Sequence, residues 1–292
     1  MLKLELVEAV LARALKGGAD FAEVYAQRAK KRRMKVRQGA LEEALSGLDY
    51  GAGVRLFFGT EVVYAYTNDL TQEGLMEALE TLLRAKGALG KVDEGGKGGL
   101  DFRKATPKGL HAPKVPYGEK DKRYRLERLL EAEAGARIAP AIKQVEASLL
   151  EWEEEVLVAN TEGVFAEEKR VRTRLFVLAV AQDGAEVQTG YSAPGKSVGL
   201  ELFDLYPPKA VGEKAARQAL TNLKARPAPA GTFPAVVGPG FGGVLFHEAV
   251  GHLLETTSVA RKASVLADKL GEVVASPAVT YIDDGTLPHA WG

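Results

Sequence analysis

The spacing of apolar residues predicts that the chain begins with a helix and returns to helix after a set of strands. Between Leu4 and Leu15, apolar residues recur every three or four positions, which places them on one helical face, and a pair of glycines supplies a stop. A second helix is expected from about Thr71 to Lys86. Between these helices, β-branched and aromatic residues predict strands at residues 22–27, 34–37, 50–58 and 61–66.

The following part of the chain predicts a connection, a helix and an antiparallel meander. Residues 87–116 are rich in glycine and proline, which cannot sustain a regular element for long, so we expect a mobile connection. A charged helix follows around Glu119–Glu133, and a further amphipathic helix covers Lys209–Ala225. Between these two helices, strands are expected at residues 142–150, 154–160, 171–181 and 185–192.

A domain boundary is expected where the sequence RPAPAG ends the last of these helices. Residues 1–225 then form an N-terminal α+β domain of mainly antiparallel sheets with flanking helices, and residues 226–292 form the beginning of a second domain. In this second part we expect a short apolar strand, a Gly/Pro turn and a helix within residues 233–255, followed by helix-like polar residues and a strand at residues 279–286.

Composition places the chain among globular proteins and limits its partners. Hydrophobic residues make up 46% and charged residues 27%, and Lys+Arg and Asp+Glu are equal at 39 each, so we expect no direct binding to nucleic acid and none to a membrane. The basic run Lys30–Arg33 is typical of a solvated turn or strand face. The chain has no cysteine, which excludes disulfides and thiolate metal sites within these residues.

Two of the four histidines stand in the sequence FHEAVGHLLE, residues 246–255, with a glutamate beside the first. Zinc is bound by imidazoles together with a carboxylate, thiolate or water. In the familiar H-E-x-x-H pattern both rings share a helical face, whereas His247 and His252 are five residues apart and would point about 140° apart on a regular helix. A shared metal therefore requires a π-type turn or a local break, for which Gly251, costly in a helix interior, is suitably placed.

The spacing alone leaves two interpretations of these histidines open. They form a zinc site, or they lie in a buried helix where the imidazoles bond to backbone carbonyls. A phosphate-binding loop just before the helix is disfavoured, because the glycines of PGFGG lack the G-x-G-x-x-G spacing and no phosphate-binding lysine follows them.

The motif and its surroundings resemble the TldD/PmbA family, and within it the TldD branch of zinc metallopeptidases. The hallmark of that branch is this five-spaced His-Glu motif, and the PmbA branch lacks the histidine pair. Other segments of the chain are similar to the family as well, so that the resemblance covers nearly the whole sequence: Gly51–Leu70, Ala159–Gly163 and Lys269–Pro288.

The resemblance implies a function and a site. His247 and His252 would be the zinc ligands, and Glu248 would be the general base that takes a proton from the zinc-bound water as it attacks a peptide carbonyl. Substrates would be unfolded or extended peptides. The protein would be cytoplasmic and would form a homodimer, or a heterodimer with a PmbA-type subunit.

The sequence departs from the family pattern in two respects. Thr256 and Thr257 follow the motif where the family has an aspartate. Family members also run well beyond 292 residues and take a third zinc ligand from a distal cysteine, and this chain contains none. The chain is therefore expected to correspond to the N-terminal domain and only the beginning of the catalytic domain.

The third zinc ligand is not identifiable from the sequence. Two protein ligands hold zinc poorly, so we predict that the chain binds zinc weakly and hydrolyses peptides slowly. The acids that could substitute have simpler explanations as turn residues or exposed helical acids, and His289, like His111, lies in a loop-like context. The residues chemically able to complete the site are Glu255, Asp268, Asp283, Asp284 and His289.

The sequence is therefore compatible with three functions. The first is a TldD-like zinc-dependent peptidase. The alternative is a catalytically incomplete family member that acts as a peptide-binding or partner subunit, which the missing cysteine favours. The third, from the family's older description, is modulation of DNA gyrase, and the balanced charge allows this only as an indirect action.

Overall fold

The computed structural model describes residues 1–87, 100–105, 112–240 and 242–290. The chain divides into two compact units, and each is described by itself. The first unit comprises Met1–Ala225 with Gly285–Gly292, and the second comprises Arg226–Asp284. Among the described residues, no helix is both long enough and apolar enough to cross a membrane.

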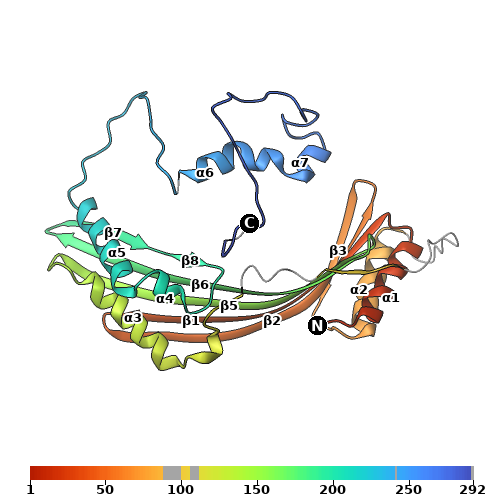
Figure 1. Ribbon diagram of the computed structural model, residues 1–292, viewed down its shortest axis with the longest axis horizontal. Helices are drawn as coiled ribbons and strands as arrows, with labels where there is room; N and C mark the ends of the chain where they lie inside the picture. Colours follow the sequence, from red (N-terminus) through yellow and green to blue (C-terminus); the bar gives the residue numbers. More distant parts are fainter. Residues whose placement is uncertain (88–99, 106–111, 241, 291–292) are drawn as a thin grey trace. The chain divides into compact units, whose positions relative to one another are not determined.

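The first unit is built on a large sheet with helices on one of its faces (Figure 1). Its strands are β1 (Phe21–Arg37), β2 (Ala40–Phe58), β3 (Glu61–Thr67), β4 (Arg103–Ala105), β5 (Ile142–Asn160), β6 (Val164–Asp183), β7 (Glu186–Ser192) and β8 (Gly195–Lys196). Its helices are α1 (Leu4–Lys16), α2 (Gln72–Ala85), the 3-10 turn η1 (Tyr117–Glu119), α3 (Lys122–Ala136), α4 (Leu202–Leu205) and α5 (Pro208–Asn222).

The described strands form an eight-stranded sheet in the order β3-β2-β1-β5-β6-β4, and β7 and β8 also pair with β6. Every pair in the described part is antiparallel except β4 with β6. The predicted α+β class with a mainly antiparallel sheet is therefore confirmed.

The central strands are longer than the sequence pattern predicted. Strands β1, β2, β5 and β6 run for 17 to 20 residues. The separate strands predicted at 22–27 and 34–37 are both parts of β1, and those at 142–150 and 154–160 are both parts of β5. The prediction was wrong here because polar residues in the strand centres interrupt the apolar alternation, and ion pairs between neighbouring strands, such as Arg32 with Glu153, replace apolar contacts there.

A tight hairpin turn was also missed. Gln38 and Gly39 join β1 to β2, and both have positive φ, 52° and 78°. Two such residues give a turn whose twist matches the strands it joins. Because this turn pairs β1 with β2 along their whole length, β2 begins at Ala40 and not near residue 50 as predicted.

Two apolar clusters occupy the same face of the sheet, at opposite ends of the long strands. In the continuous β1–β5 register, Met34 pairs with Leu149 and Val24 with Ala159. Met34 and Val24 are an even number of residues apart, so their side chains share a face. Helices α3 and α5 cover the first cluster and α1 and α2 cover the second (Figure 1).

Helix positions agree with the sequence signals. Thr71 caps α2 by accepting a hydrogen bond from the backbone N–H of Gly74 at 3.2 Å, and Asp121 caps α3 in the same way. The charged helix begins a few residues later than predicted. Most of the predicted mobile connection, residues 88–99 and 106–111, lies outside the described residues, and its described part contains β4.

The second unit contains short helical segments. They are α6 (Gly243–Phe246), the π turn η2 (His247–Gly251), the 3-10 turn η3 (His252–Leu254) and α7 (Thr256–Ala260). The strands predicted at the start of 233–255 and at 279–286 are absent from the described residues. Neither segment has a partner strand within the described part, and an isolated strand is not stable in water.

Candidate metal centre

The histidine helix departs from regular α geometry where the sequence predicted it would. The backbone N–H of His252 donates to the carbonyl of His247, which is the five-residue closure of a π turn. The segment His247–Gly251 adopts this conformation between α6 and η3. The predicted π-type turn is confirmed.

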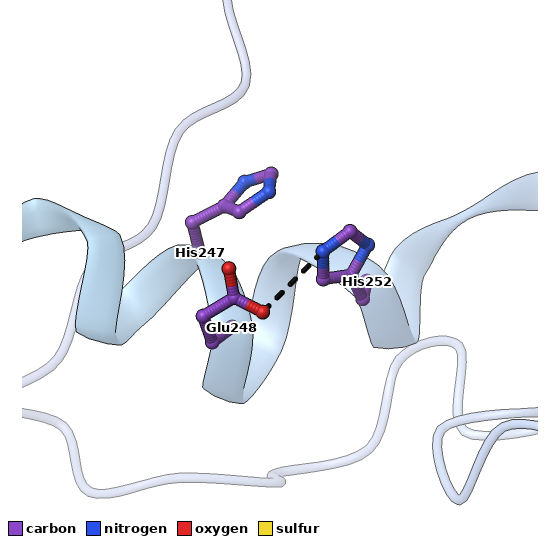
Figure 2. A group of neighbouring side chains, drawn as sticks. All are labelled: His247, Glu248 and His252. Carbon is purple, nitrogen blue, oxygen red and sulfur yellow. Dashed lines mark ion pairs between the residues drawn. The ribbon is translucent and has the colours of Figure 1, made fainter.

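The π turn brings three side chains together. The ring centroids of His247 and His252 lie 4.5 Å apart, with their planes inclined by 64°. A carboxylate oxygen of Glu248 lies 3.5 Å from Nε2 of His252, and Figure 2 shows both imidazoles and this carboxylate on one side of the helix. One candidate ligand atom from each of the three residues lies within 4.8 Å of the others.

Gly251 allows this approach by having no side chain. Its backbone angles, φ −55° and ψ −50°, are ordinary helical values that any residue adopts. A Cβ at this position would lie 3.1 Å from Nδ1 of His247 and 3.2 Å from the hydroxyl of Tyr281. The glycine therefore provides space for the imidazole, and the expected break in the backbone is not its role.

Glu255 holds the second imidazole in position. Its carboxylate lies 2.7 Å from Nδ1 of His252, which leaves Nε2 on the side of Glu248. The hydrogen bond to Glu255 raises the pKa of His252, and the charges of Glu255 and Glu248 act in the same direction. Because the imidazole keeps its proton to higher pH than usual, protons compete more strongly with a metal, and metal affinity is expected to fall as the pH falls.

The other proposed third ligands do not join this cluster within the described residues. Glu255 binds the far nitrogen of His252, so it orients a ligand instead of supplying a ligand atom beside the others. Asp268 forms an ion pair with Lys262 at 3.0 Å. His289 belongs to the first unit, where its Nδ1 lies 3.3 Å from the carbonyl oxygen of Ser197. His111 lies outside the described residues.

The sequence interpretation missed the orienting role of Glu255. Its spacing of three residues after His252 was the available signal, because residues three apart on a helix lie on the same face. Tyr281 was missed as well. It stands in a segment that was expected to be a strand, so nothing in the sequence placed its hydroxyl near Gly251.

Removing the Glu255 carboxylate is expected to weaken metal binding. We expect Glu255→Gln to lower zinc affinity about 10- to 100-fold, since a partner that fixes the ring and increases its basicity typically contributes this much. Competition with a chromogenic chelator at fixed pH measures the effect. Glu272→Gln, which removes an exposed acid of the same unit paired with Lys269, should leave the affinity unchanged. Equal affinities of the two variants would contradict the orienting role.

The donor set fits a zinc ion. Zinc binds imidazole nitrogen and carboxylate oxygen at about 2.0 to 2.2 Å, so tetrahedral ligand atoms lie about 3.3 to 3.6 Å apart. The three candidate atoms, within 4.8 Å of one another, need only small side-chain rotations to reach this spacing. The cluster is exposed, which leaves room for water or substrate.

Comparison with known proteins assigns the fold and the family. The PmbA/TldA metallopeptidase domain 1 matches residues 22–86, the central domain matches residues 113–223, and the C-terminal domain matches residues 230–292. Among solved structures, TldE from Thermococcus kodakarensis superposes with a TM-score of 0.69 at 17% identity, covering 98% of this chain and 63% of that one. A candidate modulator of DNA gyrase from Bacteroides thetaiotaomicron superposes with a TM-score of 0.71 at 19% identity, covering 94% and 63%.

Curated relatives are named metalloproteases. A metalloprotease TldD homologue from Haemophilus influenzae is 32% identical over 283 residues, covering 94% of this chain and 57% of the relative. A metalloprotease from Methanothermobacter thermautotrophicus is 30% identical over 269 residues, covering 92% and 58%. The chain thus spans less than three fifths of the length of these two relatives. By these matches the expected resemblance is confirmed, and the chain belongs to the PmbA/TldD metallopeptidase family.

Proposed function

We propose that the chain carries the zinc-binding helix of a TldD-like peptidase that hydrolyses peptide bonds in unfolded or extended peptides. The observation that carries the proposal is the convergence of His247, Glu248 and His252 on one side of a π turn, with candidate ligand atoms within 4.8 Å. The names of the curated relatives support the same class of reaction.

In this proposal the three side chains have different tasks. His247 and His252 hold the zinc ion, which would polarise the peptide carbonyl and acidify water when bound. Glu248, adjacent to the first ligand, accepts a proton from the attacking water as the water oxygen bonds to the carbonyl carbon of the peptide. The same carboxyl group then gives that proton to the departing amine as the C–N bond breaks. Glu255 keeps the ring of His252 aligned during these steps.

Zinc is expected to be bound weakly by this chain. Three candidate donors converge among the described residues, one of them the proposed base, so two imidazoles carry most of the binding. After exhaustive dialysis we expect clearly less than one zinc per chain by atomic emission. Full occupancy after dialysis would show that a further ligand is present.

Metal dependence tests the proposed reaction. With zinc added in excess, the chain should cleave a disordered peptide, and a chelator should abolish cleavage. His247→Ala should also abolish it, because one imidazole cannot hold the ion in a defined position. His289→Ala is the matched control and should retain activity, since this histidine lies in the first unit. Cleavage that persists in the chelator would overturn the proposal.

A second function is favoured by the small donor set of the cluster, which offers three candidate ligand residues among those described. The chain would then bind peptides, or pair with a second copy or a PmbA-type subunit, without catalysis. Peptide binding with no cleavage at saturating zinc would support this alternative. Light scattering of the purified chain, alone and mixed with a PmbA-type protein, would identify the dimer.

A further inference from the structure

The face of the large sheet opposite the helices holds a pocket of about 980 Å³ in the first unit. We call it the cationic groove. Its lining includes four cations and two apolar residues: Lys31, Arg33, Arg174 and Lys196, and Leu150 and Trp152. It is made entirely of residues of the first unit, and the metal centre lies in the second.

The strand register explains how this surface is made. Lys31 pairs with Trp152 on β5, and Trp152 pairs with Arg172 on β6, so these three side chains form one row across the sheet. Two residues further along, Arg33, Leu150 and Arg174 form a second row on the same face. Each row has an apolar residue at its centre and a cation on either side.

Most of the cations of the cationic groove have acidic partners, but two do not. Lys31 pairs with Asp49 at 2.6 Å, and Arg33 pairs with Glu43 at 3.2 Å. Arg174 and Lys196 form no ion pair with any described residue. The side chain of Arg174 is exposed and lies across Gly195, where a Cβ would come within 3.0 Å of its Nε. Both residues line the cationic groove, where Gly195 lies opposite Arg174 and Lys196 follows it on β8, so two cations without an acidic partner are available to an anionic group.

The centre of the cationic groove is apolar. The indole of Trp152 has the ammonium of Lys31 4.6 Å from its centroid and the guanidinium of Arg172 5.3 Å from it. Leu150 is 41% exposed and is the apolar centre of the second row. An apolar side chain bound beside Trp152 and Leu150 would lie next to the unpaired cations.

The chemistry of the surface favours a polypeptide over a nucleic acid. Asp49 and Glu43 flank the cationic groove, and such carboxylates would repel a continuous run of phosphates. The protein's own backbone already makes a contact of this kind in the cationic groove: the N–H of Ser197 donates to the carbonyl of His289, which lines the groove, at 3.0 Å. A short peptide that combines isolated carboxylates with apolar side chains matches both rows.

We propose that the cationic groove binds extended peptide segments that carry a carboxylate next to an apolar side chain. Arg174 and Lys196 bind the carboxylate, and Trp152 and Leu150 contact the apolar side chain. Binding requires no metal. If the proposed peptidase function holds, the cationic groove also makes acidic peptides the favoured substrates of the peptidase. Only this consequence rests on the proposed function.

Trp152 provides the readout. The sequence contains two tryptophans, so a Trp291→Phe background leaves the one in the cationic groove as the only indole. Fluorescence is titrated in the presence of a chelator with two capped hexapeptides, one alternating leucine with glutamate and the other alternating leucine with glutamine. We expect the glutamate peptide to bind about tenfold more tightly, as charge-assisted contacts to two cations imply.

Variants locate the site. Arg174→Gln combined with Lys196→Gln should remove the preference for the glutamate peptide. Lys209→Gln combined with Lys214→Gln changes the net charge equally at exposed positions of α5 and should preserve it. Circular dichroism verifies that both proteins are folded. Equal binding of the two peptides to the parent protein, or a preference unchanged by the Arg174 and Lys196 substitutions, would overturn the proposal.

Two further outcomes separate this proposal from its alternatives. Tighter binding of a short oligothymidylate than of the glutamate peptide would overturn the assignment to peptides. Binding of the glutamate peptide by a protein that never cleaves it, even with zinc in excess, would sink the peptidase proposal and leave the cationic groove as a peptide site.

Discussion

Glu248→Gln is expected to reduce peptide hydrolysis about 10²- to 10⁴-fold at saturating zinc, the usual contribution of a general base. Glutamine has nearly the shape of glutamate but cannot accept the proton of the attacking water. The residue lies beside His247, and its carboxylate is 3.5 Å from Nε2 of His252, so the loss should appear in kcat. Single-turnover cleavage of a quenched fluorescent peptide measures the chemical step.

Zinc binding separates the two roles open to Glu248. If it acts only as the base, Glu248→Gln keeps the zinc affinity of the parent chain. If it is also a ligand, the affinity falls together with the rate. The Glu272→Gln variant should match the parent in both measurements. A Glu248→Gln protein with the parent rate would remove Glu248 from the reaction.

Glu151→Ala is expected to lower the free energy of unfolding of the first unit by about 3–5 kcal/mol, because it leaves a buried guanidinium without its counter-charge. Arg125 and Glu151 are 7% and 2% exposed, and the carboxylate accepts from Nε of Arg125 at 2.5 Å. The remaining guanidinium nitrogens donate to carbonyls that precede or begin α3, including that of Tyr117. The ion pair therefore anchors the start of α3 to β5.

Urea unfolding followed by circular dichroism measures this loss. Glu153 is the matched control, since it lies two residues along the same strand face but is half exposed and pairs with Arg32 at 3.5 Å. Glu153→Ala should cost about 1 kcal/mol or less, as surface ion pairs do. Similar losses in the two variants would mean that burial does not determine the energetics of this network.

The sequence predicts the elements of the fold in which apolar residues recur at a constant spacing along the chain. Helices α1, α2 and α5 followed from apolar residues every three or four positions, and Thr71 correctly indicated a helix start. The strand centres were not predictable in this way. Around Lys30–Arg33 the alternation disappears, because charged side chains there pair with acids on neighbouring strands: Lys31 with Asp49 on β2, and Arg32 with Glu151 on the distant strand β5. Cross-strand charge pairs leave no local pattern in a single sequence.

The candidate site was predictable in its members and in its backbone. A metal shared by His247 and His252, five residues apart, required a π-type turn or a local break, and a π turn is present. The role of Gly251 was not predictable, since the sequence shows that this residue lacks a side chain but does not show which groups lie where a side chain would be. They are the imidazole of His247 and the hydroxyl of Tyr281. Tyr281, thirty residues away, approaches the same point only through the folding of a segment without regular structure.

The π turn has a consequence for how this motif arises and how it is detected. A π turn differs from an α turn by one inserted residue, so a single in-frame codon gained or lost within HEAVG interconverts the five- and four-spaced histidine motifs while the flanking helix keeps its register. An alignment that permits no gap inside a helix would pair His252 with the wrong column of an H-E-x-x-H protein. A chain with such a turn therefore escapes a search for the shorter motif even though its two imidazoles lie close together, with ring centroids 4.5 Å apart.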